Sequence, residues 1–376
     1  MVFGFLRSYF LLSSICTCAL LGGGILSFTT TQARDLINTS NPTTLTPPSA
    51  PNRQQLRELL LQGQKYVDRG DFSRAIAVYQ QAATLDQNNA KIFGGMGYLY
   101  VHQGRYDEAI QAYQKALSLD PNSPEFYDGL AVSYASFGNN NNAITAYAAA
   151  IELEPNSPKY YLGMGILLLR EGDYQRVFDA YQQITAIDPN NEEAAVMMGA
   201  ALLQQGQSET TLSYLQKAVQ RFPQRLELQL QLVTAYLDQN NLDAAKSLIG
   251  SLRQQDPDNL SIQLKTGQVL EKESQWSEAL QLYQQAGQKQ PQSLEIKAAI
   301  ARVLLSQEDY GAAAIAFQAL VNSEPNNADF YYSLGLALQK EQRTEEAQPY
   351  LQKAQQLYRQ HNNVEGLKKV ELLLNH

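Results

Sequence analysis

Thiols are nearly absent from this chain of 376 residues, which has two cysteines, Cys16 and Cys18. Both lie in one uncharged stretch near the N-terminus. The rest of the chain therefore cannot form a disulfide framework, a zinc–thiolate site or a cysteine nucleophile. A protein without thiols is compatible with an oxidising compartment.

Side chains for enzyme chemistry are equally scarce. The chain has three histidines, His102, His361 and His376, and it has no phosphate-binding loop, nucleophile elbow or HExxH motif. A lone histidine such as His102 is far more often a surface or packing residue than a catalyst. The sequence therefore predicts a protein that is not an enzyme and that requires no cofactor.

Positive charge is also in short supply. The chain carries 29 Lys and Arg against 37 Asp and Glu, a formal net charge of −8. Residues 124–291 hold 19 acidic and 11 basic side chains, so the negative excess lies in the middle of the chain. Because no basic patch is present, we expect no nucleic-acid partner. An acidic middle favours basic partners or divalent cations, and a solvated surface that aids solubility is the alternative.

What the chain does contain is a strict repeat. Seven prolines follow one another at intervals of 34 residues, without insertion or deletion: Pro121, Pro155, Pro189, Pro223, Pro257, Pro291 and Pro325. A period of this length is typical of stacked helix pairs. If each proline is position 32, residues 56–361 divide into nine units, which begin at Leu56, Ala90, Pro124, Pro158, Glu192, Leu226, Leu260, Leu294 and Ala328.

Residue types at fixed positions of the unit explain how two helices could pack. Positions 8 and 20 are mostly glycine and alanine, which allow close approach, and position 24 is mostly a large apolar residue. Position 15 is glycine in the first five units, which suits a turn between the helices. We expect less tight turns in the last four units, where this position holds Asn240, Ser274, Glu308 and Gln342.

This pattern resembles the tetratricopeptide repeat family over residues 56–361. The resemblance implies an all-α fold, a superhelical solenoid of nine antiparallel helix pairs whose first helices line a concave face. After the ninth unit, Val364, Leu367, Val370 and Leu373 or Leu374 recur at helical spacing. We therefore expect residues 362–376 to form a capping helix, with a frayed tail as the alternative.

Residues 1–33 are expected to direct export. Tyr9 to Phe28 carries no charged residue, Arg7 precedes it, and Thr31 and Ala33 suit cleavage after Ala33. A cleaved signal peptide is favoured, and an N-terminal membrane anchor is the alternative. Either one predicts repeats that are periplasmic or otherwise outside the cytoplasm. Membrane contact is expected only through an uncleaved N-terminus or a membrane-protein partner. Residues 34–55, rich in Pro and Thr, are expected to be a linker.

The family resemblance places positions 2, 5, 9, 12 and 13 of each unit on the concave face. An apolar strip with polar edges is how a groove holds a peptide or a helix of another protein. Contact of several of these side chains with the adjacent unit is the alternative. The residues expected to line a partner-binding groove are Tyr98, Val132, Leu162, Ile166, Leu169, Val196, Leu203, Leu230 and Leu237.

By architecture and size the chain is also similar to the processing-associated tetratricopeptide proteins of cyanobacteria, the PratA type. This similarity implies a periplasmic assembly factor that engages the D1 precursor of photosystem II, with its C-terminal tail as the guest, and that helps to supply manganese. Hard cations such as Mn²⁺ prefer carboxylates, so Glu192, Glu193, Glu227 and Asp238 are candidate ligands, with ordinary surface acids as the alternative. A scaffold for secretion or for cell-envelope polysaccharide export is the second functional hypothesis.

Overall fold

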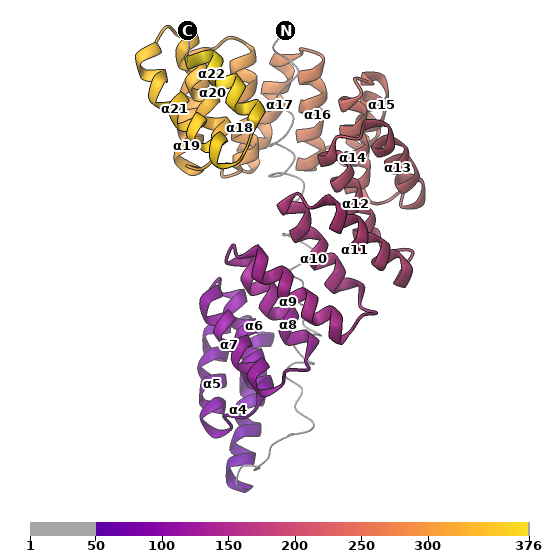
Figure 1. Ribbon diagram of the computed structural model, residues 1–376, viewed down its shortest axis with the longest axis vertical. Coiled ribbons are helices and arrows are strands. Elements are labelled where there is room, and N and C mark those ends of the chain that lie inside the picture. The colour runs from indigo at the N-terminus through magenta and orange to yellow at the C-terminus, as the bar shows by residue number, and fades with distance from the viewer. Residues whose placement is uncertain (1–49, 375–376) are drawn as a thin grey trace. The chain divides into compact units, whose positions relative to one another are not determined.

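The computed structural model describes residues 50–374, which form nineteen helices and no strand (Figure 1). The expected signal of residues 1–33 and residues 34–49 of the expected linker lie outside the described part. Helix α4 begins at Ala50, so the last six residues of the predicted linker are helical. Pro51 is tolerated there because the N–H groups of a first turn have no intrahelical acceptor. In the described part, no helix combines the length and the apolar character that crossing a membrane requires.

The described chain divides into two compact units between Gln205 and Gly206. The division falls inside the fifth repeat. The helices of the first compact unit are α4 (Ala50–Asp68), α5 (Phe72–Leu85), α6 (Ala90–His102), α7 (Tyr106–Leu119), α8 (Pro124–Ser136), α9 (Asn140–Leu153), α10 (Pro158–Glu171), α11 (Tyr174–Ile187) and α12 (Glu192–Gln205).

The second compact unit contains the remaining ten described helices. They are α13 (Ser208–Arg221), α14 (Leu226–Asp238), α15 (Leu242–Gln255), α16 (Leu260–Lys272), α17 (Trp276–Lys289), α18 (Leu294–Ser306), α19 (Tyr310–Ser323), α20 (Ala328–Lys340), α21 (Thr344–Gln360) and α22 (Val364–Leu374).

The observed helix bounds follow the predicted 34-residue units. We call the first helix of each unit its A helix (even numbers from α4 to α20) and the second its B helix (odd numbers from α5 to α21). From the second unit onward, every A helix begins at the predicted first residue of its unit, from α6 at Ala90 to α20 at Ala328. The B helices from α7 to α19 end two residues before position 32, where proline cannot continue a helix. The predicted all-α tetratricopeptide solenoid is confirmed.

Helix starts are fixed by short polar side chains. Position 16 caps the B helix in five units, where its side-chain oxygen accepts a hydrogen bond from the backbone N–H three residues on. Such a cap satisfies one of the donors that the first turn leaves unpaired and stabilises the helix by about 1 kcal/mol. The capping residues are Asp71, Asn139, Asp173, Asn241 and Asp309.

The prediction of less tight turns in the last four units was wrong. Asn240, Ser274, Glu308 and Gln342 have φ between 58° and 64°, close to the left-handed values of the five glycines at position 15 of the earlier units. Two backbone hydrogen bonds close each of these turns. At Gly104 they run from Gly104 N–H to Val101 O and from Arg105 N–H to Tyr100 O, and at Glu308 from Glu308 N–H to Leu305 O and from Asp309 N–H to Leu304 O. The fold therefore imposes the left-handed conformation even where the side chain opposes it.

A tyrosine at position 24 packs between two A helices. Tyr113 on α7 is fully buried, and a Cβ at Gly97 on α6 would lie 2.7 Å from its ring. On the other side, a Cβ at Gly129 on α8, the first helix of the next unit, would lie 2.2 Å from Tyr113 Cζ. Tyr147 meets Gly163 of the following unit in the same way, at 2.4 Å. Glycine at position 6 thus makes room for the tyrosine of the preceding unit.

Helix α22 covers the end of the second compact unit, as expected of a cap. It packs against α21 and α20, with Val370 fully buried and Leu367 half-buried. Val364 was predicted on the covered apolar face but is 64% exposed, because it is the first residue of the helix.

We expect Glu308→Gly to stabilise the protein by about 1 kcal/mol, because glycine adopts the left-handed conformation without the Cβ strain of glutamate. Gly104→Ala is the matched reverse change and should cost a similar amount. No atom lies within 4 Å of a Cβ at Gly104, so backbone strain alone would account for the loss. Urea unfolding measures both. Equal stability of Glu308→Gly and the parent protein would contradict this account of the turns.

We expect Gly129→Ala to destabilise the protein by about 1–3 kcal/mol, because its methyl group would overlap the Tyr113 ring. Gly250→Ala on α15 is the control. No atom lies within 4 Å of a Cβ there, so alanine should be neutral or stabilising by up to about 1 kcal/mol. Thermal unfolding of both variants distinguishes the effect of steric overlap with the Tyr113 ring from the effect of the higher helix propensity of alanine. A Gly129→Ala variant as stable as the parent protein would rule out the close packing.

Candidate functional site

The A helices of successive repeats pack directly on one another. In the first compact unit α6 contacts α8 and α10 contacts α12, and in the second α14 contacts α16. The family resemblance assigns positions 2, 5, 9, 12 and 13 of each A helix to the concave face, and we call this set of positions the inner face.

The nine predicted groove residues differ in exposure. Leu162 on α10 is half-buried. The other eight are buried, each with 1–7% of its surface exposed: Tyr98, Val132, Ile166, Leu169, Val196, Leu203, Leu230 and Leu237.

Several of these side chains have defined neighbours. Leu230 and Leu237 belong to the core between α14, α15 and α16, together with Val233, Ile249 and Ile262. The ring of Tyr98 lies edge-on to His102, with centroids 4.4 Å apart, and His102 also stacks on Phe72 at 5.2 Å. The groove assignment stays a prediction, and Leu162 is its most accessible point.

An ion pair joins two A helices on the inner face of the first compact unit. Asp128, at position 5 on α8, lies 3.5 Å from the Nζ of Lys159, at position 2 on α10. The Asp128 side chain is 14% exposed and Lys159 is 39% exposed. Burial raises the pKa of Asp128 to about 6, although Lys159 acts to lower it, and Glu125 raises it further. The pair therefore holds a partly desolvated carboxylate on the inner face.

The inner face of the second compact unit carries a charged network instead. Arg302 on α18 donates two hydrogen bonds to Glu271 on α16, from Nε at 2.8 Å and Nη2 at 2.7 Å. The hydroxyl of Tyr283 on α17 donates to the same carboxylate at 2.6 Å. Two parallel bonds between guanidinium and carboxylate fix orientation as well as charge. Glu271 and Arg302 occupy positions 12 and 9 of consecutive A helices.

Lys265 on α16 lies beside this network and is 5% exposed. Its Nζ donates to Thr234 Oγ1 on α14 at 2.9 Å and to Gln268 Oε1 at 2.7 Å. Burial lowers the pKa of Lys265 to about 8, because the attraction of Glu295 and Asp238 does not offset the loss of hydration. Lys265 was not predicted as a site residue because it occupies position 6, which is not among the positions assigned to the concave face.

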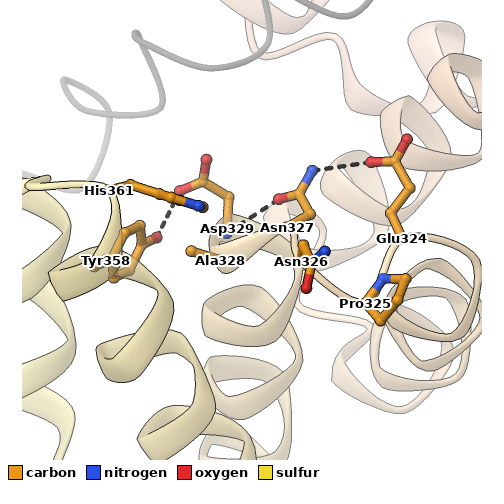
Figure 2. A pocket seen from close by; sticks show the side chains of 8 residues that line it. All are labelled: Glu324, Pro325, Asn326, Asn327, Ala328, Asp329, Tyr358 and His361. Carbon is orange, nitrogen blue, oxygen red and sulfur yellow. Dashed lines mark hydrogen bonds between the residues drawn. The ribbon is translucent and has the colours of Figure 1, made fainter. Parts of the chain in front are cut away.

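A pocket of about 410 Å³ opens between the loop that precedes α20 and the end of α21 (Figure 2). Helix α21 has 17 residues, three more than the other B helices, and it carries Arg359 where α7 to α19 have proline and α5 has Gln87. Its last turn brings Tyr358 and the following His361 to the pocket, and the Tyr358 hydroxyl donates to Asp329 Oδ1 at 2.5 Å.

Hydrogen bonds fix the opposite wall of this pocket. Asn327 Nδ2 donates to Glu324 Oε2 at 3.2 Å, and Asn327 Oδ1 accepts from the backbone N–H of Asp329 at 3.1 Å. Burial raises the pKa of Asp329 even though the bond from Tyr358 opposes the shift. Two carboxylates beside an aromatic ring suit a basic side chain better than an acidic one.

The four candidate manganese ligands lie on two helices. Glu192 is exposed and Glu193 half-buried at the start of α12, whereas Glu227 and Asp238 are half-buried at the two ends of α14. Glu227 Oε2 lies 3.1 Å from Arg225 Nε. Between residues 50 and 374 there is no group of three or more His, Cys, Asp or Glu side chains that could hold a metal. These carboxylates therefore do not form a preassembled site for Mn²⁺.

Comparison with known families agrees with this architecture. The family described as the cilia and flagella-associated protein 70 C-terminal domain, a tetratricopeptide domain, matches residues 29–259. Tetratricopeptide repeat families match residues 230–293, 270–334 and 328–361. Because the first match covers more than half of the chain, the chain belongs to this family of tetratricopeptide repeat domains. No curated protein matches it in a sequence search.

Solved structures show the same fold. A tetratricopeptide repeat protein from Parabacteroides merdae has a TM-score of 0.59 at 16% identity, with 67% of this chain and 99% of that chain covered. The APC/C hetero-tetramer Cut9–Hcn1 has a TM-score of 0.54 at 17% identity, with 93% of this chain and 68% of that chain covered. Tetratricopeptide folds are generally non-enzymatic, and this chain is a protein-interaction scaffold of that type.

We expect Asp128→Asn to stabilise the protein at pH 7 by about 2–3 kcal/mol, because the change removes a buried carboxylate that ionises at a cost. The unfolded chain releases this proton near pH 4 and the folded protein near pH 6. Stability of the parent therefore falls as pH rises through this window. Urea unfolding between pH 4 and pH 7 should show a variant-minus-parent difference that grows with pH, and a difference independent of pH would contradict the assignment.

Proposed function

We propose that this scaffold holds a segment of another protein against its inner face. The observation that carries the proposal is the packing of α6 on α8, of α10 on α12 and of α14 on α16, which brings side chains of successive A helices together. The half-buried Leu162 lies on α10 with Lys159, which pairs with Asp128 on the preceding A helix. Apolar contact would supply most of the affinity, and the charges would set the register of the guest segment.

The proposal extends to an exported assembly factor. The uncharged stretch from Tyr9 to Phe28, with Arg7 before it, supports export of the repeats. By its resemblance to the cyanobacterial processing-associated proteins, the guest we propose is the C-terminal tail of the D1 precursor of photosystem II. The supply of manganese rests on this resemblance alone, since the described carboxylates offer no ready cluster.

A photo-crosslinking side chain placed at Leu162 should capture the guest in the cells that make this protein. The same reactive group at Ile315 is the control, because Ile315 is 76% exposed on the B helix α19 and outside the inner face. We expect an adduct with a protein segment outside the cytoplasm from position 162 and none of the same mass from position 315. Mass spectrometry of the adduct identifies the captured chain.

Leu162→Glu should then weaken binding of the captured segment by about tenfold or more, because a charge replaces an apolar contact. Ile315→Glu should leave binding unchanged, and circular dichroism should show the same helix content for both variants. Adducts from both positions alike, or equal binding by both variants, would contradict a guest on the inner face. Capture of a component of cell-envelope export would replace the D1 precursor as the guest.

A further inference from the structure

The ammonium group of Lys265 is a buried cation of the second compact unit that the proposed function does not yet use. An ammonium carries three N–H donors. Two of them reach neutral oxygens, Thr234 Oγ1 at 2.9 Å and Gln268 Oε1 at 2.7 Å. Among the described residues no carboxylate lies within ion-pair distance of its Nζ, unlike the neighbouring Arg302, which Glu271 holds at 2.7 Å. Lys265 is therefore a buried cation with hydrogen-bonding capacity left over.

The surroundings of Lys265 place it at the floor of the inner face. Its side chain joins α16 to α14 through Thr234, which is also buried. Gln268, Asp238 and Glu295 are half-buried around it. A guest segment that crosses α14, α16 and α18 would thus pass over partly exposed polar groups and meet the ammonium beneath them.

The charges around Lys265 restrict what can bind there. Glu295 on α18 and Asp238 on α14 attract the ammonium, and Arg302 on α18 repels it. An incoming carboxylate would approach Glu295 and Asp238, which repel it, whereas a neutral amide oxygen would accept the third N–H without this repulsion.

We infer that Lys265 is an anchor for the main chain of a guest, donating a hydrogen bond to an amide oxygen of a neutral or basic segment on the inner face of the second compact unit. The inference rests on the proposed function in that the guest lies on this face. Main-chain recognition holds a segment irrespective of its side chains, and the acidic rim then selects against acidic sequences. A bond from a charged donor in a poorly hydrated site is among the stronger kinds of hydrogen bond.

The test uses the full chain and capped hexapeptides of alanine with glutamine, lysine or glutamate, so that it needs no natural guest. NMR of the lysine side chains follows the titration of Lys265. An acceptor oxygen favours the charged ammonium, so the neutral and the lysine peptides should raise the pKa of Lys265 from about 8 in a saturable manner. The glutamate peptide should have a smaller effect at the same concentration.

Lys265→Met and Lys272→Met form the matched pair of variants for the same peptides. Lys272 lies on the same helix and is exposed. Calorimetry should show binding of the neutral peptide weakened about tenfold or more by Lys265→Met, as expected for loss of a bond to a charged group, and unchanged by Lys272→Met. Methionine is close in volume, so thermal unfolding checks that the fold is kept.

Three results would overturn the inference. The first is a titration of Lys265 that no peptide alters. The second is a glutamate peptide that raises the pKa of Lys265 more than the other peptides do. The third is equal binding of the neutral peptide by the two methionine variants. The NMR titration of the parent protein decides the question even if Lys265→Met does not fold. If the inference about Lys265 fails, capture of a guest through Leu162 can still support the proposed function, since Leu162 belongs to the first compact unit.

Discussion

The contact between a position-24 tyrosine and the glycine of the next A helix is the constraint on which the stack depends. Tyr113 reaches beyond its own pair and fills the space that Gly129 leaves on α8. A single helix pair cannot bury such a ring, so each repeat needs its neighbour, as expected for a solenoid. The same contact fixes the spacing of the A helices in the first compact unit, and therefore which of their side chains meet.

Spacing of the A helices in turn determines the electrostatics of the inner face. Asp128 meets Lys159, Glu271 meets Arg302, and Lys265 meets Thr234, each across two consecutive A helices. The inner face of the first compact unit presents the ion pair of Asp128 with Lys159 and the half-buried Leu162. The second presents a denser network in which charge is fixed by hydrogen bonds. The faces of the two compact units therefore differ in the charge that they carry.

Much of the fold could be predicted from the sequence because the same pattern of residue types recurs in nine units. Proline at position 32 predicted where the B helices α7 to α19 end. Of the two B helices that lack it, α21 runs three residues further and α5 does not. The turns at Ser274 and Glu308 could not be predicted, since local propensity opposes the left-handed conformation that packing imposes. Lys265 was missed for a different reason. Its role depends on which atoms surround one ammonium group, and a repeat pattern does not record that.

Hydrogen exchange of the full chain with and without a captured guest tests the central claim most directly. The account predicts slower exchange in the A helices of the inner face, such as α8 and α10, with the B helices α9 and α11 unchanged. Protection confined to the B helices, or spread evenly over both, would show that the guest binds elsewhere and would contradict the inner face as the binding surface.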